Sequence, residues 1–141
     1  MLKCQKIDHG TSPIAVYADL SFFKLYMSDV GFFVIKSGAP QQTILTGESN
    51  VFMGSVTENY VAQALASNGH ALFYWASEHS AELDFVLQKD SEIIGIEVKK
   101  GTKVHSKSLS VFILKNNPAI PSAFLKRILN NLRIHYPFHF M

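Results

Sequence analysis

The sequence of 141 residues contains a single cysteine, Cys4, and no long run of apolar residues. One thiol excludes a disulfide within the chain and a zinc site built from several thiolates. The longest apolar runs, residues 30–35 and 71–76, are far shorter than the roughly 20 residues needed to cross a bilayer. The first residues, MLKCQK, lack the apolar stretch of an export signal. We therefore expect a cytoplasmic protein with no membrane partner.

Motifs that bind nucleotide phosphates are also missing. The chain has no Gly-x4-Gly-Lys-Ser/Thr loop and no Gly-x-Gly-x-x-Gly turn, and it lacks the Gly-x-Ser-x-Gly elbow of serine hydrolases. We expect no nucleotide cofactor. Apolar residues nevertheless make up 48% of the chain and charged residues 17%, a composition typical of a globular domain with one core.

Acidic residues are absent after residue 98. Residues 1–98 hold five lysines and all eleven acids, a formal charge of −6, whereas residues 99–141 hold six lysines and two arginines, a charge of +8. A basic segment beside an acidic one suits DNA, whose phosphates need cations close to a negatively charged site. Lys100, Lys103 and Lys107 precede and open a predicted helix, where backbone amides favour phosphate, so they are the expected DNA contacts. A solvated lysine-rich surface is the alternative interpretation.

Residues 55–69 predict a helix. Ser55-Val56-Thr57-Glu58 fits a capping box at its start, and Gly69 suits its end. One broad apolar face would contain Val56, Tyr60, Val61, Ala64 and Leu65. Glu58 lies at the edge of this face, where it is either the capping carboxylate or a metal ligand.

Residues 82–99 predict two antiparallel strands joined by a turn at Asp90-Ser91, because apolar and polar residues alternate on both sides of it. In this register the numbers of paired residues sum to 181. On one side of the hairpin, Leu83 faces Val98, Phe85 faces Ile96 and Leu87 faces Ile94. On the other side, Asp84 lies opposite Glu97 and Glu82 lies opposite Lys99.

If Asp84 and Glu97 lie opposite each other as predicted, a positive charge is needed to offset the repulsion between their carboxylates. Opposed residues have β-carbons about 5 Å apart, and like charges at that distance repel. Mg²⁺ or Mn²⁺ bound to both carboxylates, with Glu58 as a further ligand, would relieve the repulsion. Lys99 would act beside them as a catalytic cation that orients or deprotonates a water molecule. The alternative is a solvated sheet face on which Lys99 only pairs with Glu82.

The arrangement of Asp84 before Glu97-Val98-Lys99 resembles the signature of the PD-(D/E)XK nuclease superfamily. The resemblance implies an α/β (α+β) fold with a restriction-endonuclease-like core, in which helices flank a mixed central sheet in the order helix, three strands, helix, strand. It also implies metal-dependent hydrolysis of DNA phosphodiesters, with Glu58 as the helical acid. Pro118 and Pro121 would interrupt the last strand, because each removes a hydrogen-bond donor from the ladder.

A narrower resemblance extends over residues 17–117. Its blocks are Phe23–Gly31, Thr57–Leu65, Tyr74-Trp75, Ala81–Val86, Ile96–Gly101 and Ser106–Phe112. In order and spacing they are similar to the uncharacterised C-terminal domain of bacterial and archaeal AAA-type ATPases. The resemblance implies a separate AAA-type ATPase as a partner, because this sequence lacks the ATPase module.

We therefore expect residues 1–50 to be an N-terminal extension left from a larger chain, residues 51–117 to form the nuclease-like core, and residues 118–141 to be a divergent basic tail. Within residues 1–50, aromatic residues favour short strands and turns. The leading functional hypothesis is a metal-dependent nuclease-like domain that acts on DNA. The second is a catalytically inactive nuclease fold that serves as a DNA-binding or regulatory module for a partner ATPase. The third is a structural remnant with no activity of its own.

Overall fold

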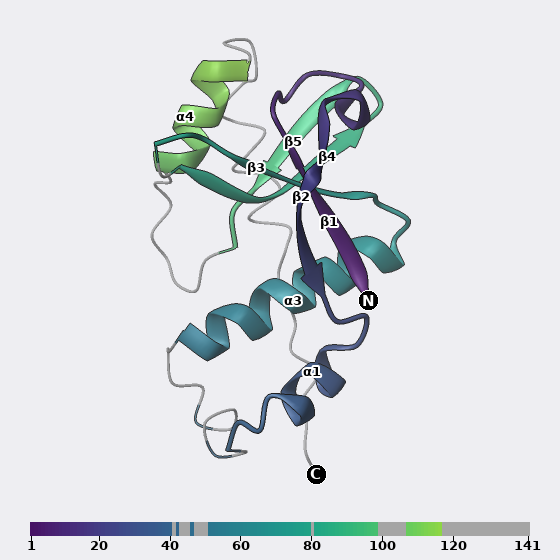
Figure 1. Ribbon diagram of the computed structural model, residues 1–141, viewed down its shortest axis with the longest axis vertical. Helices are drawn as coiled ribbons and strands as arrows, with labels where there is room; N and C mark the ends of the chain where they lie inside the picture. The colour runs from purple at the N-terminus through teal and green to yellow at the C-terminus, as the bar shows by residue number, and fades with distance from the viewer. Residues whose placement is uncertain (41, 43–45, 47–50, 80, 99–106, 117–141) are drawn as a thin grey trace.

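The computed structural model describes residues 1–40, 42, 46, 51–79, 81–98 and 107–116 (Figure 1). In chain order, the elements are β1 (Leu2–Ile7), the short 3-10 helix η1 (Ile14–Tyr17), β2 (Ala18–Tyr26), α1 (Val30–Lys36), α3 (Val51–Ser67), β3 (Leu72–Ala76), β4 (Glu82–Lys89), β5 (Glu92–Ile96) and α4 (Lys107–Asn116). Among these helices, none has the length and apolar character needed to cross a membrane.

The strands form a five-stranded sheet in the order β2-β1-β3-β4-β5. β1 runs parallel to β3, and the other neighbours are antiparallel, so the sheet is mixed. The run α3-β3-β4-β5-α4 follows the predicted order of a helix, three strands and a helix. The mixed α/β fold class is therefore confirmed. The predicted last strand, at residues 118–121, lies outside the described residues.

Apolar side chains cover both faces of the sheet. In β3, Leu72 and Tyr74 pack on the side of α3, whereas Phe73 and Trp75 pack on the side of α4, as the alternation of a strand requires. The buried core on the α3 side consists of Cys4, Tyr26, Val61, Ala62, Leu72, Tyr74, Phe85, Leu87, Ile94 and Ile96. The core on the α4 side consists of Ile7, Ile14, Phe73, Trp75, Leu83, Val86 and Phe112. Burial of these two apolar surfaces holds the helices against the sheet.

Phe112 anchors α4 to the sheet. Its side chain is fully buried, and its ring meets Trp75 edge-on with centroids 5.2 Å apart. Gly10, in the loop after β1, lies directly against this ring, because a β-carbon at that position would be 2.2 Å from Phe112 Cζ. The backbone N–H of Gly10 also donates to Asn116 Oδ1 at 2.6 Å. The first loop of the chain therefore helps to fix the last described helix.

β4 and β5 pair in the predicted register. Phe85 lies opposite Ile96 and Leu87 opposite Ile94, so this part of the hairpin prediction is confirmed. Asp90 adopts a φ of 56° in the turn, a conformation that a short polar side chain tolerates. The ladder ends at the pair of Phe85 with Ile96. Asp84 and Glu97 therefore do not form the predicted strand pair.

A bulge in β4 overturns part of the predicted alternation. Between the pairs Phe73–Val86 and Trp75–Leu83, β4 contains one residue more than β3. Leu83 consequently packs with Trp75 on the α4 side, while Phe85 packs on the α3 side. Phe85 and Val98 share the α3 side as predicted, but the prediction that Leu83 lies on the same side is wrong, because the extra residue shifts the alternation by one position.

α3 begins earlier than the sequence predicted. Its first residue is Val51, so Glu58 lies in the interior of the helix. The hydroxyl of Ser55 donates to the Val51 carbonyl at 3.3 Å, a bond within the helix rather than a cap. The capping-box interpretation of Ser55 and Glu58 is wrong, because residues 51–54 continue the helix on the N-terminal side.

The end of α3 lies where it was predicted. Gly69 has a φ of 82°, and His70 N–H donates to the Leu65 carbonyl at 3.1 Å, the hydrogen bond of a Schellman motif. The predicted apolar face is right in part. Val61 is buried, but Tyr60 is exposed.

The described part of the first 50 residues contributes β1, η1, β2 and α1 to the same fold. β1 lies between β2 and β3, so this segment is part of the sheet. Asp29 caps α1 by accepting a hydrogen bond from Phe32 N–H at 2.7 Å, a helix where the sequence favoured strands and turns. Asn59 of α3 binds both the N–H and the carbonyl of Met27, at 2.8 and 3.0 Å. The domain boundaries at residues 50 and 117 stay predictions.

Candidate functional site

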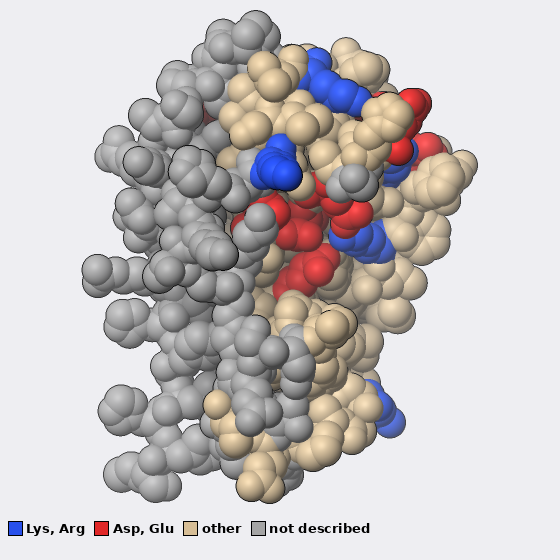
Figure 2. All heavy atoms as spheres, turned by 90° about the vertical axis from the view of Figure 1, so that its left-hand side faces the viewer, with Lys and Arg blue, Asp and Glu red and all other residues tan. Residues whose placement is uncertain are grey.

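Acidic side chains from two elements meet the ammonium group of Lys24. Lys24 lies on β2, and its Nζ atom is 3.4 Å from a carboxylate oxygen of Glu58 on α3. The same Nζ donates to the carboxylate of Glu82 at the start of β4 and lies 5.0 Å from the centre of the Tyr74 ring. Figure 2 shows acidic side chains gathered in the middle of one face of the molecule with lysines beside them. We call Lys24, Glu58, Glu82 and Asp84 the acidic cluster.

Tyr26 contacts the acidic cluster from the same strand as Lys24. It lies two residues after Lys24 on β2, hence on the same side of the strand, and its hydroxyl donates to the Glu58 carboxylate. Burial and this hydrogen bond raise the pKa of Tyr26 far above its usual range, so the hydroxyl stays protonated and acts as a donor. Cys4, paired with Lys24 across β1 and β2, is fully buried, and burial raises the pKa of its thiol to about 12. The thiol is therefore an inert part of the core.

The pKa of Asp84 is strongly perturbed. Its Oδ2 atom accepts a hydrogen bond from Val98 N–H at 2.6 Å, which ties β4 to the backbone just after β5. Burial raises the pKa of Asp84 to about 6, and the charges of Glu58 and Glu82 add to that effect. The hydrogen bond from Val98 and the charge of Lys24 oppose it without cancelling it. At neutral pH, Asp84 is thus an anion held in an unfavourable environment.

This raised pKa predicts that Asp84→Asn stabilises the metal-free protein at pH 7. The folded state keeps the Asp84 proton up to about pH 6, whereas the unfolded chain releases it near its ordinary pKa of 3.8. The contribution of Asp84 to stability is therefore most favourable below pH 4 and is lost as the pH rises to 6. We expect a gain of no more than about 1–2 kcal/mol at pH 7, because the side chain is partly exposed, and none at pH 4.

Urea unfolding of both proteins in EDTA, at pH 4 and pH 7, measures this difference. Each protein is compared with the other at the same pH, so that the titration of the remaining carboxylates cancels. A destabilised Asp84→Asn variant at pH 7 would contradict the prediction and would mean that the bond to Val98 outweighs the burial of the charge.

The structure describes only some of the other predicted site residues. Glu97 is half-buried and directly follows β5, and the peptide that joins it to Val98 supplies the N–H bound by Asp84. Lys107 is exposed at the start of α4. Lys99, Lys100 and Lys103 lie outside the described residues. The structure thus brings Glu58 and Asp84 into one cluster.

The sequence did not point to Lys24 or Tyr26. In the sequence prediction, the partner of Glu82 was Lys99, whereas the structure pairs Glu82 with Lys24. A weak signal was present, since Lys24 and Tyr26 are polar residues two positions apart at the end of β2. That spacing places both on one side of the strand, but it does not indicate which acids they meet.

The chemistry of the cluster suits a hard divalent cation. Glu58 and Asp84 offer carboxylate oxygens, the ligands that Mg²⁺ and Mn²⁺ prefer. A carboxylate has about four acceptor positions, and the bond from Val98 uses one of those on Asp84. Among the described residues, however, no group of three or more His, Cys, Asp or Glu side chains is already arranged around a metal position. Lys24 and Tyr26 both bond the same oxygen of Glu58, Oε1.

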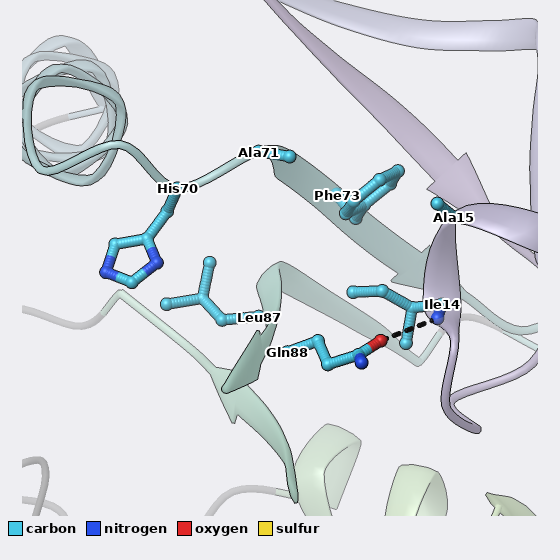
Figure 3. Close-up of a pocket in the computed structure, with 7 residues that line it drawn as sticks. All are labelled: Ile14, Ala15, His70, Ala71, Phe73, Leu87 and Gln88. Carbon is cyan, nitrogen blue, oxygen red and sulfur yellow. Dashed lines mark hydrogen bonds between the residues drawn. The ribbon is translucent and has the colours of Figure 1, made fainter. Parts of the chain in front are cut away.

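A separate cavity of about 150 Å³ lies near the end of α3. It is lined by Ile14, Ala15, His70, Ala71, Phe73, Leu87 and Gln88 (Figure 3). Gln88 Oε1 accepts a hydrogen bond from Ile14 N–H at 2.9 Å, so its amide already has a structural role. No carboxylate lines this cavity, and we therefore place the candidate site at the acidic cluster instead.

The fold and the site define a mixed α/β domain that carries an acidic cluster on one face of its sheet. The chain belongs to the family described as "Domain of unknown function (DUF4143)", whose model matches residues 53–136. No curated protein and no solved structure matches the chain. The matched region includes Glu58, Glu82 and Asp84, whereas Lys24 and Tyr26 precede it.

Proposed function

We propose that this chain is a metal-dependent nuclease-like domain that acts on DNA phosphodiesters. The proposal includes a restriction-endonuclease-like core of the kind found in the C-terminal part of AAA-type ATPases. The observation that carries it is the charge of the acidic cluster, in which Glu58 and Glu82 pair with the ammonium group of Lys24 and the nearby, partly buried Asp84 adds a third negative charge. The cluster also lies where β4 meets the backbone next to Glu97. An excess of negative charge in such a place favours a bound cation.

Asp84 and Glu97, with Glu58, are the residues that would hold Mg²⁺ or Mn²⁺. Such an ion polarises a phosphate oxygen and lowers the pKa of a bound water. The Val98 N–H orients the Asp84 carboxylate, and Tyr26 orients that of Glu58. Lys99 keeps its predicted role as the catalytic cation, and Lys100, Lys103 and Lys107 keep theirs as phosphate contacts.

Calorimetric titration with Mn²⁺ tests this proposal. We expect the wild-type protein to bind Mn²⁺ at millimolar or lower concentrations and to cleave DNA with it. Asp84→Asn should lose both, because the amide cannot supply the negative charge that the ion needs. Asp90→Asn is the matched control, since it removes one aspartate from the exposed turn of the same hairpin. Absence of a binding signal for the wild-type protein would contradict the proposal.

A second candidate function is a catalytically inactive nuclease fold that binds DNA or regulates a partner ATPase. The contacts of Glu58 favour it, because Lys24 and Tyr26 already neutralise and bind this carboxylate. In that case DNA should bind in EDTA, and its affinity should fall steeply as the salt concentration rises. Binding that does not depend on salt, or no binding, would exclude this candidate.

A further inference from the structure

The outer edge of β2 exposes apolar side chains at a place where another strand can pair with it. β2 is the terminal strand on its side of the sheet, so none of the described strands pairs with this edge. Leu20, Phe22, Phe23 and Leu25 are 74%, 57%, 48% and 52% exposed. Proteins usually protect such an edge with proline or with charged side chains, and β2 contains no proline.

The charged side chains of β2 do not protect the edge either. Lys24 turns its ammonium group across the sheet, where it pairs with two glutamates of the acidic cluster and lies 5.0 Å from the centre of the Tyr74 ring on β3. Asp19 lies in the irregular part of the strand and accepts a hydrogen bond from Ser21 N–H at 2.8 Å. Over residues 22–26, the one charge of β2 is therefore directed toward the middle of the sheet.

The exposed rings of β2 lie on both faces of the sheet. The Phe22 ring is 5.3 Å from the ammonium group of Lys6, which lies on the α3 side like Cys4, two residues before it. The Phe23 ring is 4.8 Å from the ammonium group of Lys3, which alternates to the α4 side. A partner that docks on one face of the sheet would cover one of these rings. An added strand would cover both, because its own side chains also alternate.

We propose that β2 pairs antiparallel with β2 of a second copy of this chain, with Phe23 of each copy opposite Leu25 of the other, so that the two sheets join into one. Such a pair is two-fold symmetric, the commonest symmetry of protein dimers. This inference does not depend on the proposed function, because none of its contacts involves a metal or DNA.

The edge complements itself in this register. On the α4 side Phe23 meets Leu25, and on the α3 side Phe22 meets Tyr26, so that apolar and aromatic side chains face each other. The two Lys24 stems also lie opposite each other, but each ammonium group points into its own sheet and keeps its own carboxylates. A strand with charged side chains at these positions would leave its charges unpaired, whereas a second β2 brings none. Charge complementarity thus favours a second copy as the partner.

Sedimentation equilibrium of the whole chain tests the proposal. We expect the wild-type protein to dimerise with a dissociation constant in the micromolar range or below. Phe23→Asp should raise this constant at least about 100-fold, because each copy loses a buried ring and gains a charge on its edge. Circular dichroism should show that the variant still folds, since Phe23 is half exposed in the single copy. A wild-type protein that remains a monomer throughout the micromolar range would overturn the proposal.

Leu114→Asp is the matched control. Leu114 is 78% exposed on α4, which packs on β4 and β5 at the other side of the sheet from β2. This variant gains the same charge without touching the edge, so its dissociation constant should equal that of the wild-type protein. A dimer that Leu114→Asp dissociates and Phe23→Asp leaves intact would contradict the proposed interface.

Cysteine cross-linking tests the register and covers the case in which Phe23→Asp does not fold. Phe23→Cys and Leu25→Cys are oxidised separately and as a mixture. Cys4 does not compete, because it is fully buried. In the proposed dimer, positions 23 and 25 of opposite copies have β-carbons about 5 Å apart, within reach of a disulfide. Like positions are offset by two residues, roughly 7 Å along the strand, and are out of reach.

We therefore expect a disulfide-linked dimer in the mixture and none in either variant alone. A cross-link in one variant alone, without one in the mixture, would show a different register and would overturn the proposal. The same holds if none of the three samples forms a cross-link.

Discussion

Replacing Phe112 with alanine is expected to lower the free energy of unfolding by about 3–5 kcal/mol. Phe112 is fully buried, is the buried residue of α4, and packs against Trp75 and Gly10. Alanine would leave a cavity beside Trp75 and would reduce the contribution of α4 to this core to the partly buried Leu109 and Val111. The loss should also release α4 from the sheet.

Denaturant unfolding followed by tryptophan fluorescence measures this effect, since Trp75 lies next to the substituted ring. Leu114→Ala on the same helix is the control. Leu114 is 78% exposed, so its replacement should change the free energy of unfolding by less than about 0.5 kcal/mol. Similar effects of the two substitutions would mean that α4 does not pack as described.

Leu83→Ala is expected to lower the free energy of unfolding by about 2–5 kcal/mol, since Leu83 is fully buried. The bulge in β4 makes a sharper prediction about its partners. Leu83 packs in the same core as Phe112, whereas Phe85, two residues along the strand, packs on the opposite side of the sheet. In a regular strand without the bulge, Leu83 and Phe85 would instead pack on the same side of the sheet.

Double-mutant cycles with small truncations test the bulge. Leu83→Val with Phe112→Leu should be non-additive by about 0.5 kcal/mol or more, because the two side chains share a core. Leu83→Val with Phe85→Leu should be additive to within about 0.5 kcal/mol, because the sheet separates them. The opposite pattern would show that β4 alternates regularly, and Asp84 would then face away from Glu58.

The hairpin of β4 and β5 was predictable because its determinants are local. Apolar residues alternate on both strands, and Asp90-Ser91 supplies the turn between them, so the register of Phe85 with Ile96 follows from neighbouring residues. The end of α3 was predictable for the same reason, since Gly69 marks it. The sequence contains a local signal for α1 as well, because Asp29 is a typical N-cap residue. The aromatic residues around Asp29 favoured strands instead.

The orientation of Asp84 could not be read from the hairpin. It depends on how β4 pairs with β3, its other neighbour, and the bulge arises from that pairing. The contacts of Lys24 were equally hidden, because Glu58 and Glu82 lie 34 and 58 residues away in the sequence. The sequence singled out Glu58 and Asp84, which the structure places in one acidic cluster, but the cation beside them depends on long-range packing.

The place of β1 between β2 and β3 has a practical consequence for work on this family. A fragment that starts at residue 53, where the match to the family begins, would lose β1 and β2 and with them Cys4, Lys24 and Tyr26. β3 would become an unprotected edge with unpaired backbone groups, which invites aggregation. Its acids would lack their ammonium partner, so such a fragment would misreport both the solubility of the domain and the charge balance of the acidic cluster.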